Sequence, residues 1–185
     1  MNIKSKAALL LTITLGTTGL VMADDDSYFI KQWKNAPKSY LDKAEHENYL
    51  KECGACHFAY QPGLLSAASW ERVMVNLSDH FGENAELPTS EVNSIRNYLL
   101  NNAAGRVNTK LSQKMLQNNN AKQPLMRITE TSYFKKEHDE IPPKMVKDNP
   151  EVGSFSRCDA CHTRAADASF DEDEVRIPGY GRWED

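Results

Sequence analysis

The sequence predicts a mainly α protein built from two small lobes, the second of which is low in regular secondary structure. Apolar residues recur at helical spacing in several segments of the first lobe. No alternating apolar and polar run is long enough to predict a strand with confidence. Beyond residue 105 the periodicity weakens, and proline, asparagine and aspartate become more frequent. We therefore expect lobes at 24–105 and 106–185.

The first 23 residues predict a cleaved signal peptide. Lys4 and Lys6 precede an apolar run that is diluted by threonine and glycine, and three aspartates follow Ala23. A membrane anchor is the competing interpretation, but the run is short and no basic stop-transfer cluster follows it. We therefore expect export to the periplasm and no stable membrane insertion of the mature chain.

The charge balance excludes one class of function. Two of the 22 basic residues and none of the 26 acidic residues precede the expected cleavage point, so the net charge falls from −4 to −6. Nucleic-acid binding requires a basic footprint that the chain lacks. The mature chain should be an acidic protein with no nucleic-acid partner.

The helical segments follow one another along the first lobe. We expect helices at 40–57, 71–81 and 90–102, with Ser69 capping the second and Pro88-Thr89 starting the third. In the second lobe we expect a short helix that carries Leu111, Met115 and Leu116, and another that Thr131 or Ser132 caps and Ile141-Pro142-Pro143 ends. The chain after residue 170 should be extended with turns.

Two motifs of the same Cys-x-x-Cys-His pattern carry the chemistry. Cys53-Gly54-Ala55-Cys56-His57 is repeated 105 positions later as Cys158-Asp159-Ala160-Cys161-His162, and the chain has four cysteines in total. A disulfide is permitted in an exported protein. A redox-active pair requires a thioredoxin-like βαβ unit, which is not indicated here. A zinc site would bring the second pair within about 15–20 residues of the first.

The histidine that follows each pair favours a different chemistry, the covalent attachment of haem. Two thiols can add to the vinyl groups of a haem, and the adjacent histidine can then bind the iron as its proximal ligand. Two such motifs predict two covalently bound haem c groups, attached at Cys53, Cys56, Cys158 and Cys161, with His57 and His162 as proximal ligands. The lobes should then be cytochrome c-like haem lobes.

The second axial position of each iron is expected to hold another histidine. His80 continues the apolar pattern of Trp70, Val73 and Leu77, and His138 follows Phe134 by one helical turn. A core histidine is the alternative for His80, and a solvated helix face is the alternative for His138.

The remaining candidates for the axial positions are His46 and the methionines. His46 is expected at the surface, because it lies on the segment that leads into the first motif. Methionines are expected to fill gaps in the core.

His80 lies 23 residues after His57, and His138 lies 24 residues before His162, so each lobe could ligate its own haem. Crossed pairing is equally compatible with the spacing.

Several segments together resemble a known family. They are CGACHFAYQPGLL, SWERVMVNLSDHFGENAEL, IRNYLLNNAAGR, RITETSYFKKEHDEIP and CDACH followed by IPGYG. In this order they resemble the periplasmic dihaem cytochromes c called DHC. The resemblance implies two haems with two histidine ligands each, with His80 and His138 distal. It also implies an electron carrier that works with a membrane cytochrome b and a small monohaem oxygen-binding cytochrome.

The predicted function is therefore electron transfer between redox partners and not catalysis. Two strong axial ligands leave no open site on the iron for a substrate. The alternatives are a dihaem enzyme of the peroxidase type and a gas-binding haem sensor, each of which needs one open iron site.

Overall fold

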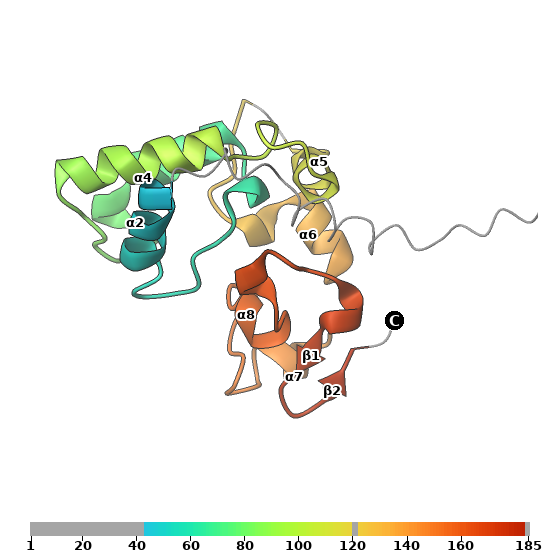
Figure 1. The fold of residues 1–185 in the computed structure, drawn as a ribbon. Coiled ribbons are helices and arrows are strands. Elements are labelled where there is room, and N and C mark those ends of the chain that lie inside the picture. Colours follow the sequence, from blue (N-terminus) through green and yellow to red (C-terminus); the bar gives the residue numbers. More distant parts are fainter. Residues whose placement is uncertain (1–42, 120–121, 184–185) are drawn as a thin grey trace, which may run out of the picture.

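The computed structural model describes residues 43–119 and 122–183 (Figure 1). The predicted signal peptide lies outside these residues. Within the described part of the chain the fold is mainly α, as the sequence predicts. The α-helices are α2 (Lys43–Cys53), α3 (Ala67–Val75), α4 (Thr89–Asn101), α5 (Lys110–Leu116), α6 (Ser132–Glu137), α7 (Pro143–Val146) and α8 (Cys158–Cys161).

Short elements complete the described structure. A single antiparallel pair of two-residue strands, β1 (Arg176–Ile177) and β2 (Gly181–Arg182), is the sheet that the described residues form. The 3₁₀ turns are Pro62–Leu64, Leu77–Asp79, Ile128–Glu130, Ala165–Asp167 and Glu172–Glu174. No described helix is both long and apolar enough to span a bilayer.

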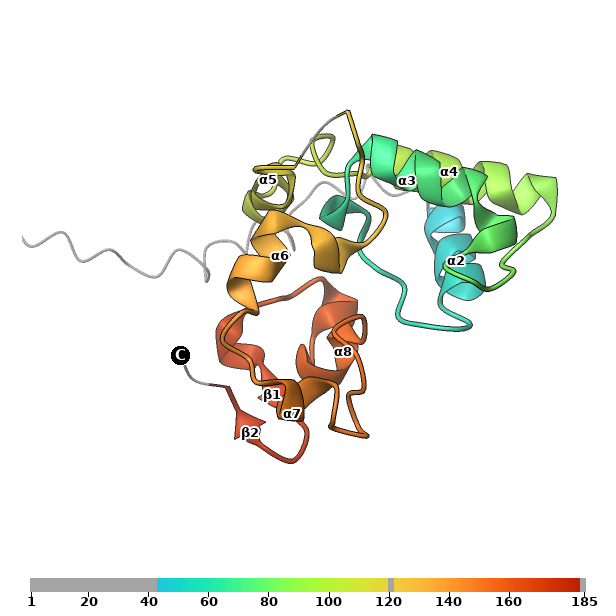
Figure 2. The same cartoon turned by 180° about the vertical axis from the view of Figure 1, so that it is seen from behind.

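The first three helices form one group around a shared core. Helices α2 and α3 both pack on α4 (Figure 2), whose Ile95, Tyr98 and Leu99 are almost completely buried. Trp70 of α3 donates its indole N–H to the carbonyl oxygen of Pro62 at 2.7 Å. Apolar side chains at helical spacing on α4 therefore give this lobe a core made from its own residues.

The second group has little regular structure. Helices α7 and α8 have four residues each and lie with the β1–β2 hairpin, while α5 and α6 contact each other (Figure 1). The low content of regular structure beyond residue 105 is confirmed. The boundary at 105 stays a prediction, because Met126 and Ile128 pack against the core of the first group.

The predicted bounds of α3, 71–81, are wrong, because the helix begins four residues earlier and ends six residues earlier. The helix begins at Ala67, and the hydroxyl of Ser66, not of Ser69, accepts the capping bond from the Ser69 N–H at 3.1 Å. It ends at Val75, so His80 lies beyond it, after a 3₁₀ turn. The apolar pattern continued past the helix because both segments face the same core.

Ser66→Ala should lower the free energy of unfolding by about 1 kcal/mol, because it removes the side-chain cap of α3. Ser90→Ala, in the first turn of α4, removes a hydroxyl that caps no helix and should change stability little. Denaturant unfolding of both variants checks this. Equal losses in the two variants would contradict the assigned cap.

Candidate haem-binding sites

The first Cys-x-x-Cys-His motif lies at the end of α2. Cys53 ends the helix, and the Gly54 N–H donates to the carbonyl oxygen of Leu50 at 3.0 Å, which continues the helical path into a turn. A Cβ on Gly54 would collide with that oxygen, so the turn requires glycine. Cys56 and His57 lie on the exposed side of the turn.

The second motif forms its own short helix. Helix α8 runs from Cys158 to Cys161, and the His162 N–H donates to the carbonyl oxygen of Cys158 at 2.8 Å. His162 also pairs with Val175, just before β1. The β1–β2 hairpin and the residue before it therefore pack against this motif. The side chains of Cys158, Cys161 and His162 are all partly buried.

The structure brings His57 and His80 together. Their ring centres are 6.1 Å apart, and the rings are nearly parallel, with an interplanar angle of 11°. The two residues come from different elements, the turn after α2 and the segment after α3. Sequence spacing allowed this pair but did not require it.

A tight turn fixes His80. The His80 N–H donates to Glu83 O at 2.7 Å, and the Glu83 N–H donates back to His80 O at 3.3 Å. Phe81 and Gly82, between them, have φ angles of +58° and +103°. A phenylalanine rarely takes positive φ, and such strain is found where surrounding contacts hold a functional residue in place.

His138 and His162 form a second pair at the same separation. Their ring centres are also 6.1 Å apart, with an interplanar angle of 64°. Phe134 stacks on His138 at 3.9 Å, one helical turn away as the sequence indicated. Phe155 meets the His138 ring edge-on, and Phe170 does the same for His162.

The separation within each pair fits one metal ion between two imidazoles. An imidazole nitrogen lies about 2 Å from a bound metal and about 1 Å from its own ring centre, so two rings on opposite sides have centres ~6 Å apart. Both pairs meet this distance. The residues present therefore fit a haem iron in each lobe.

Hydrogen bonds of the ring nitrogens agree with this fit. Nδ1 of His57 donates to Phe58 O at 2.7 Å, and Nδ1 of His138 donates to Phe134 O at 2.9 Å. A proton on Nδ1 leaves the lone pair of Nε2 available to a metal. Within the described residues, the buried Nδ1 atoms of His80 and His162 have no partner.

The surroundings keep three of these imidazoles neutral. Burial lowers the pKa of His80, with smaller effects from His57 and Arg127. Burial also lowers the pKa of His138, against the bond to Phe134 O that raises it. For His162, burial and then the charge of His138 lower the pKa to about 4. The neutral form is the one that binds a metal.

Three of the four cysteines lack the lowered pKa of a reactive thiol. Burial raises the pKa of Cys53 to about 11 and that of Cys158 to about 12, and it also raises the pKa of Cys161. Redox-active thiols have lowered pKa values. Among residues 43–119 and 122–183, no group of three or more histidine, cysteine, aspartate or glutamate side chains is arranged to hold a metal ion.

A cavity of about 590 Å³, which we call the second-lobe cavity, surrounds the second pair. Cys158, Cys161, His138 and His162 all line it. The rest of its wall is largely apolar and includes Leu64, Leu111, Met115, Tyr133, Phe134, Val146, Val152, Phe155, Phe170, Val175, Ile177 and Trp183. Small-molecule and cofactor sites have this size and character.

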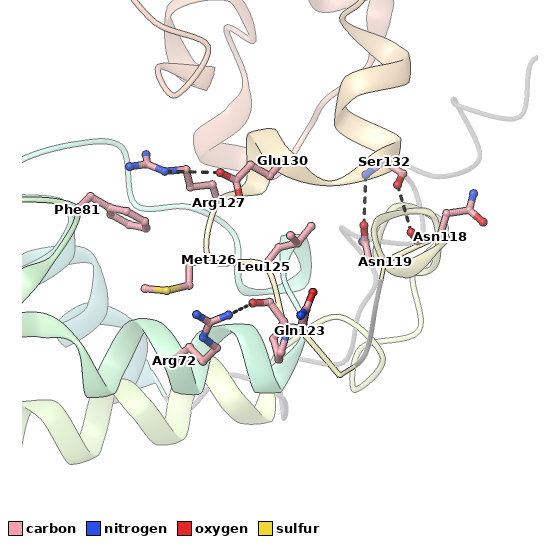
Figure 3. A pocket seen from close by; sticks show the side chains of 11 residues that line it. Arg72, Phe81, Asn118, Asn119, Gln123, Leu125, Met126, Arg127, Glu130 and Ser132 are labelled. Atoms are coloured by element: carbon pink, nitrogen blue, oxygen red, sulfur yellow. Dashed lines mark hydrogen bonds and ion pairs between the residues drawn. The ribbon is translucent and has the colours of Figure 1, made fainter.

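Another cavity, of about 670 Å³, lies beside His80 and contains no cysteine or histidine (Figure 3). Phe81 and Arg127 line it, and the Arg127 guanidinium lies 4.1 Å from the centre of the Phe81 ring. Phe81 in turn meets the His80 ring edge-on at 4.9 Å. The Arg127 guanidinium is therefore linked to the His57–His80 pair through the Phe81 ring, which contacts both Arg127 and His80.

The histidine and methionines that were not chosen as ligands have other partners. The surface position expected for His46 is wrong: the residue is half-buried, and its Nδ1 lies 2.7 Å from the Tyr98 hydroxyl. Met74 is buried in the first core, and Met126 packs against it. Met115 lines the second-lobe cavity as part of its apolar wall.

Sequence reasoning missed Tyr60, Phe81 and Arg127 as neighbours of the first pair. Each acts through a contact whose geometry depends on tertiary structure. The one local signal was the aromatic residue directly after His80, at a position where a turn was not expected. Phe155 and Phe170 were missed for the same reason.

Known proteins are similar to this chain in sequence and in structure. A family model described as dihaem cytochrome c, DHC, matches residues 49–170. The solved dihaem cytochrome c of Shewanella baltica OS155 is 42% identical, with 76% of this chain and 98% of that chain covered and a TM-score of 0.63. That of Rhodobacter sphaeroides is 37% identical, with coverage of 67% and 95% and a TM-score of 0.61. The search of curated proteins found no match.

The helical fold and the two Cys-x-x-Cys-His motifs, each beside a paired histidine, define a multihaem cytochrome of the c type. The chain belongs to the dihaem cytochrome c family, DHC. It carries two covalently bound c-type haems, and membership in the family supports a role as a haem electron carrier.

Proposed function

We propose that the protein is a periplasmic electron carrier whose two haems each have two histidine ligands. His57 and His80 would bind one iron, and His138 and His162 the other. The observation that carries this proposal is the equal separation of 6.1 Å within both pairs. It favours uncrossed pairing, in which each lobe provides both ligands of its own haem.

The two pairs are suited to electron transfer. When bound, each haem supplies an iron that gains or loses one electron. Two imidazoles held by turns and aromatic contacts would fill both axial positions, so a change of oxidation state requires little rearrangement of the protein. Histidine pairs should also give lower potentials than histidine with methionine.

The environment of the pairs suggests where partners dock. His57 and Cys56 are exposed, whereas the second pair lies in the second-lobe cavity. We propose that redox partners approach the first motif. Following the family resemblance, we further propose a membrane cytochrome b and a small monohaem oxygen-binding cytochrome as the partners. The signal peptide proposed at residues 1–23 would direct export.

The oxidised protein should give two different low-spin signals in low-temperature electron spin resonance. The orientation of the two ligand planes controls the splitting of the iron d orbitals, and the planes differ by 11° in one pair and by 64° in the other. A near-infrared spectrum should show bis-histidine bands for both haems. A high-spin signal, or a histidine–methionine band, would contradict the proposed ligands.

The same sample tests the alternatives. A peroxidase-like enzyme or a gas sensor needs an open iron site, so the reduced protein would bind carbon monoxide stoichiometrically at neutral pH. The carrier should bind none.

A further inference from the structure

Tyr60 touches the first haem site through its ring. The ring stacks on His57, with centres 5.1 Å apart and an interplanar angle of 29°. The Phe58 ring meets Tyr60 edge-on at 5.8 Å. His57 is exposed, so this stacking supplies aromatic support to the first motif from within its own loop.

The hydroxyl of Tyr60 touches the other haem site. It donates to the carbonyl oxygen of Ser156 at 2.8 Å, across 96 residues of chain. Ser156 lies two residues before Cys158, and Cys158 Sγ is 3.9 Å from the same carbonyl oxygen. One side chain therefore contacts an axial ligand of the first lobe and the attachment segment of the second.

Tyr60 is itself anchored in the first core. The hydroxyl of Tyr49 donates to the Tyr60 carbonyl oxygen at 2.6 Å, and Tyr49 is 3% exposed. Its ring packs on Tyr98 of α4. Beside it, Gln61 Nε2 donates to the Ala165 carbonyl oxygen at 3.4 Å. The backbone at 60–61 thus belongs to the first lobe, while both side chains reach the second.

The simpler explanation of the Tyr60 contacts is that the hydroxyl only finds a hydrogen-bond acceptor and has no role at the haem sites. Tyr180 is an example of such a tyrosine in the same chain. The hydroxyl of Tyr180 donates to Lys144 O at 3.3 Å, inside the second lobe and without a stacked histidine. Tyr60 differs because its two partners belong to different haem sites. Burial raises the pKa of its hydroxyl, so the group remains a donor at neutral pH.

We propose that Tyr60 is a positioning residue that couples the two haem sites, holding the His57 ring in a fixed relation to the Cys158 segment. This inference rests on the proposed role of His57 as a ligand. The orientation of one axial imidazole and the position of the other haem's attachment residues are then set by the same side chain.

The test uses the oxidised protein with both haems attached and compares Tyr60→Phe with the matched control Tyr180→Phe. Proton NMR resolves the haem methyl resonances, whose paramagnetic shifts report the orientation of the axial ligands of each haem. Tyr60→Phe removes the bond to Ser156 and should shift the methyl resonances of both haems. Tyr180→Phe should leave those of the first haem unchanged. Tyr60→Leu also removes the stacked ring and should enlarge the shift at the first haem.

Shifts confined to one haem, or absent from both, would overturn the coupling. A failure of the proposed function would be seen separately, as a high-spin signal in the unmodified protein. The coupling could still be tested in that case, because the methyl resonances of a high-spin haem also respond to the loss of the hydrogen bond between Tyr60 and Ser156. If Tyr60→Phe does not incorporate two haems, the unmodified protein with a ¹³C-labelled Tyr60 ring serves instead. The ring signals should change in two steps as the haems are reduced in turn, and a response to one haem alone would overturn the proposal.

Discussion

A triple variant, Cys158→Ala with Cys161→Ala and His162→Ala, is expected to carry one haem and to lose the ordered structure of the second lobe. Without its haem, the apolar wall of the second-lobe cavity, which has a volume of about 590 Å³, would be exposed to water, and this costs about 25 cal/mol for each Å² of apolar surface. A small protein has a total stability of about 5–15 kcal/mol. The lobe, whose helices α7 and α8 are only four residues long, cannot supply this energy from its secondary structure.

The measurement is limited proteolysis, with the mass of the protein used to count haems. Cleavage should concentrate between residues 132 and 183, while the segment with α2, α3 and α4 resists. The matched control, Cys53→Ala with Cys56→Ala and His57→Ala, should also carry one haem but keep most of its helical circular dichroism, because Ile95, Tyr98 and Leu99 stay buried among protein side chains. A second lobe that stays protease-resistant without its haem would contradict the argument.

Removal of a distal histidine should open one iron to external ligands. His80→Ala is expected to convert one of the two low-spin signals to high-spin and to let the reduced protein bind one equivalent of carbon monoxide. The physical reason is that the strained turn at Phe81 and Gly82 holds His80 in place, and no other described histidine or methionine lies in that position. His138→Ala should do the same for the other haem.

Optical titration with carbon monoxide and electron spin resonance check this prediction. His46→Ala is the control: the residue bonds to Tyr98, so its loss should leave both low-spin signals unchanged. In the companion variant His80→Met, the iron should stay low-spin with a higher potential, since methionine ligation raises it. A His80→Ala protein with both low-spin signals intact would refute the assignment of His80.

The chemistry of the attachment sites could be predicted because it is local in sequence. Thioether attachment needs two cysteines and a histidine within five residues, and the chain shows this pattern twice. Helix α4 could be predicted in the same way, because Ile95 and Leu99 recur at helical spacing on one buried face. The fold class followed from these patterns.

Other features depend on contacts between distant segments. The His46 bond joins residues 52 positions apart, and the Tyr60 bond joins residues 96 positions apart, so neither leaves a periodic signal. The start of α3 was misplaced because Ser66 and Ser69 are both competent caps, and only the fold decides between them. The pairing of the four histidines proposed as ligands also required the tertiary structure.

The unequal exposure of the two motifs has a consequence for the biosynthesis of the protein. Cys56 and His57 lie on the surface of a lobe that has a complete core, so an attachment enzyme could reach this motif late, after the surrounding helices have formed. Cys158, Cys161 and His162 face into the second-lobe cavity, behind the β1–β2 hairpin. Their haem must therefore be joined while that part of the newly made chain is still open, and the cofactor becomes the template on which the lobe closes.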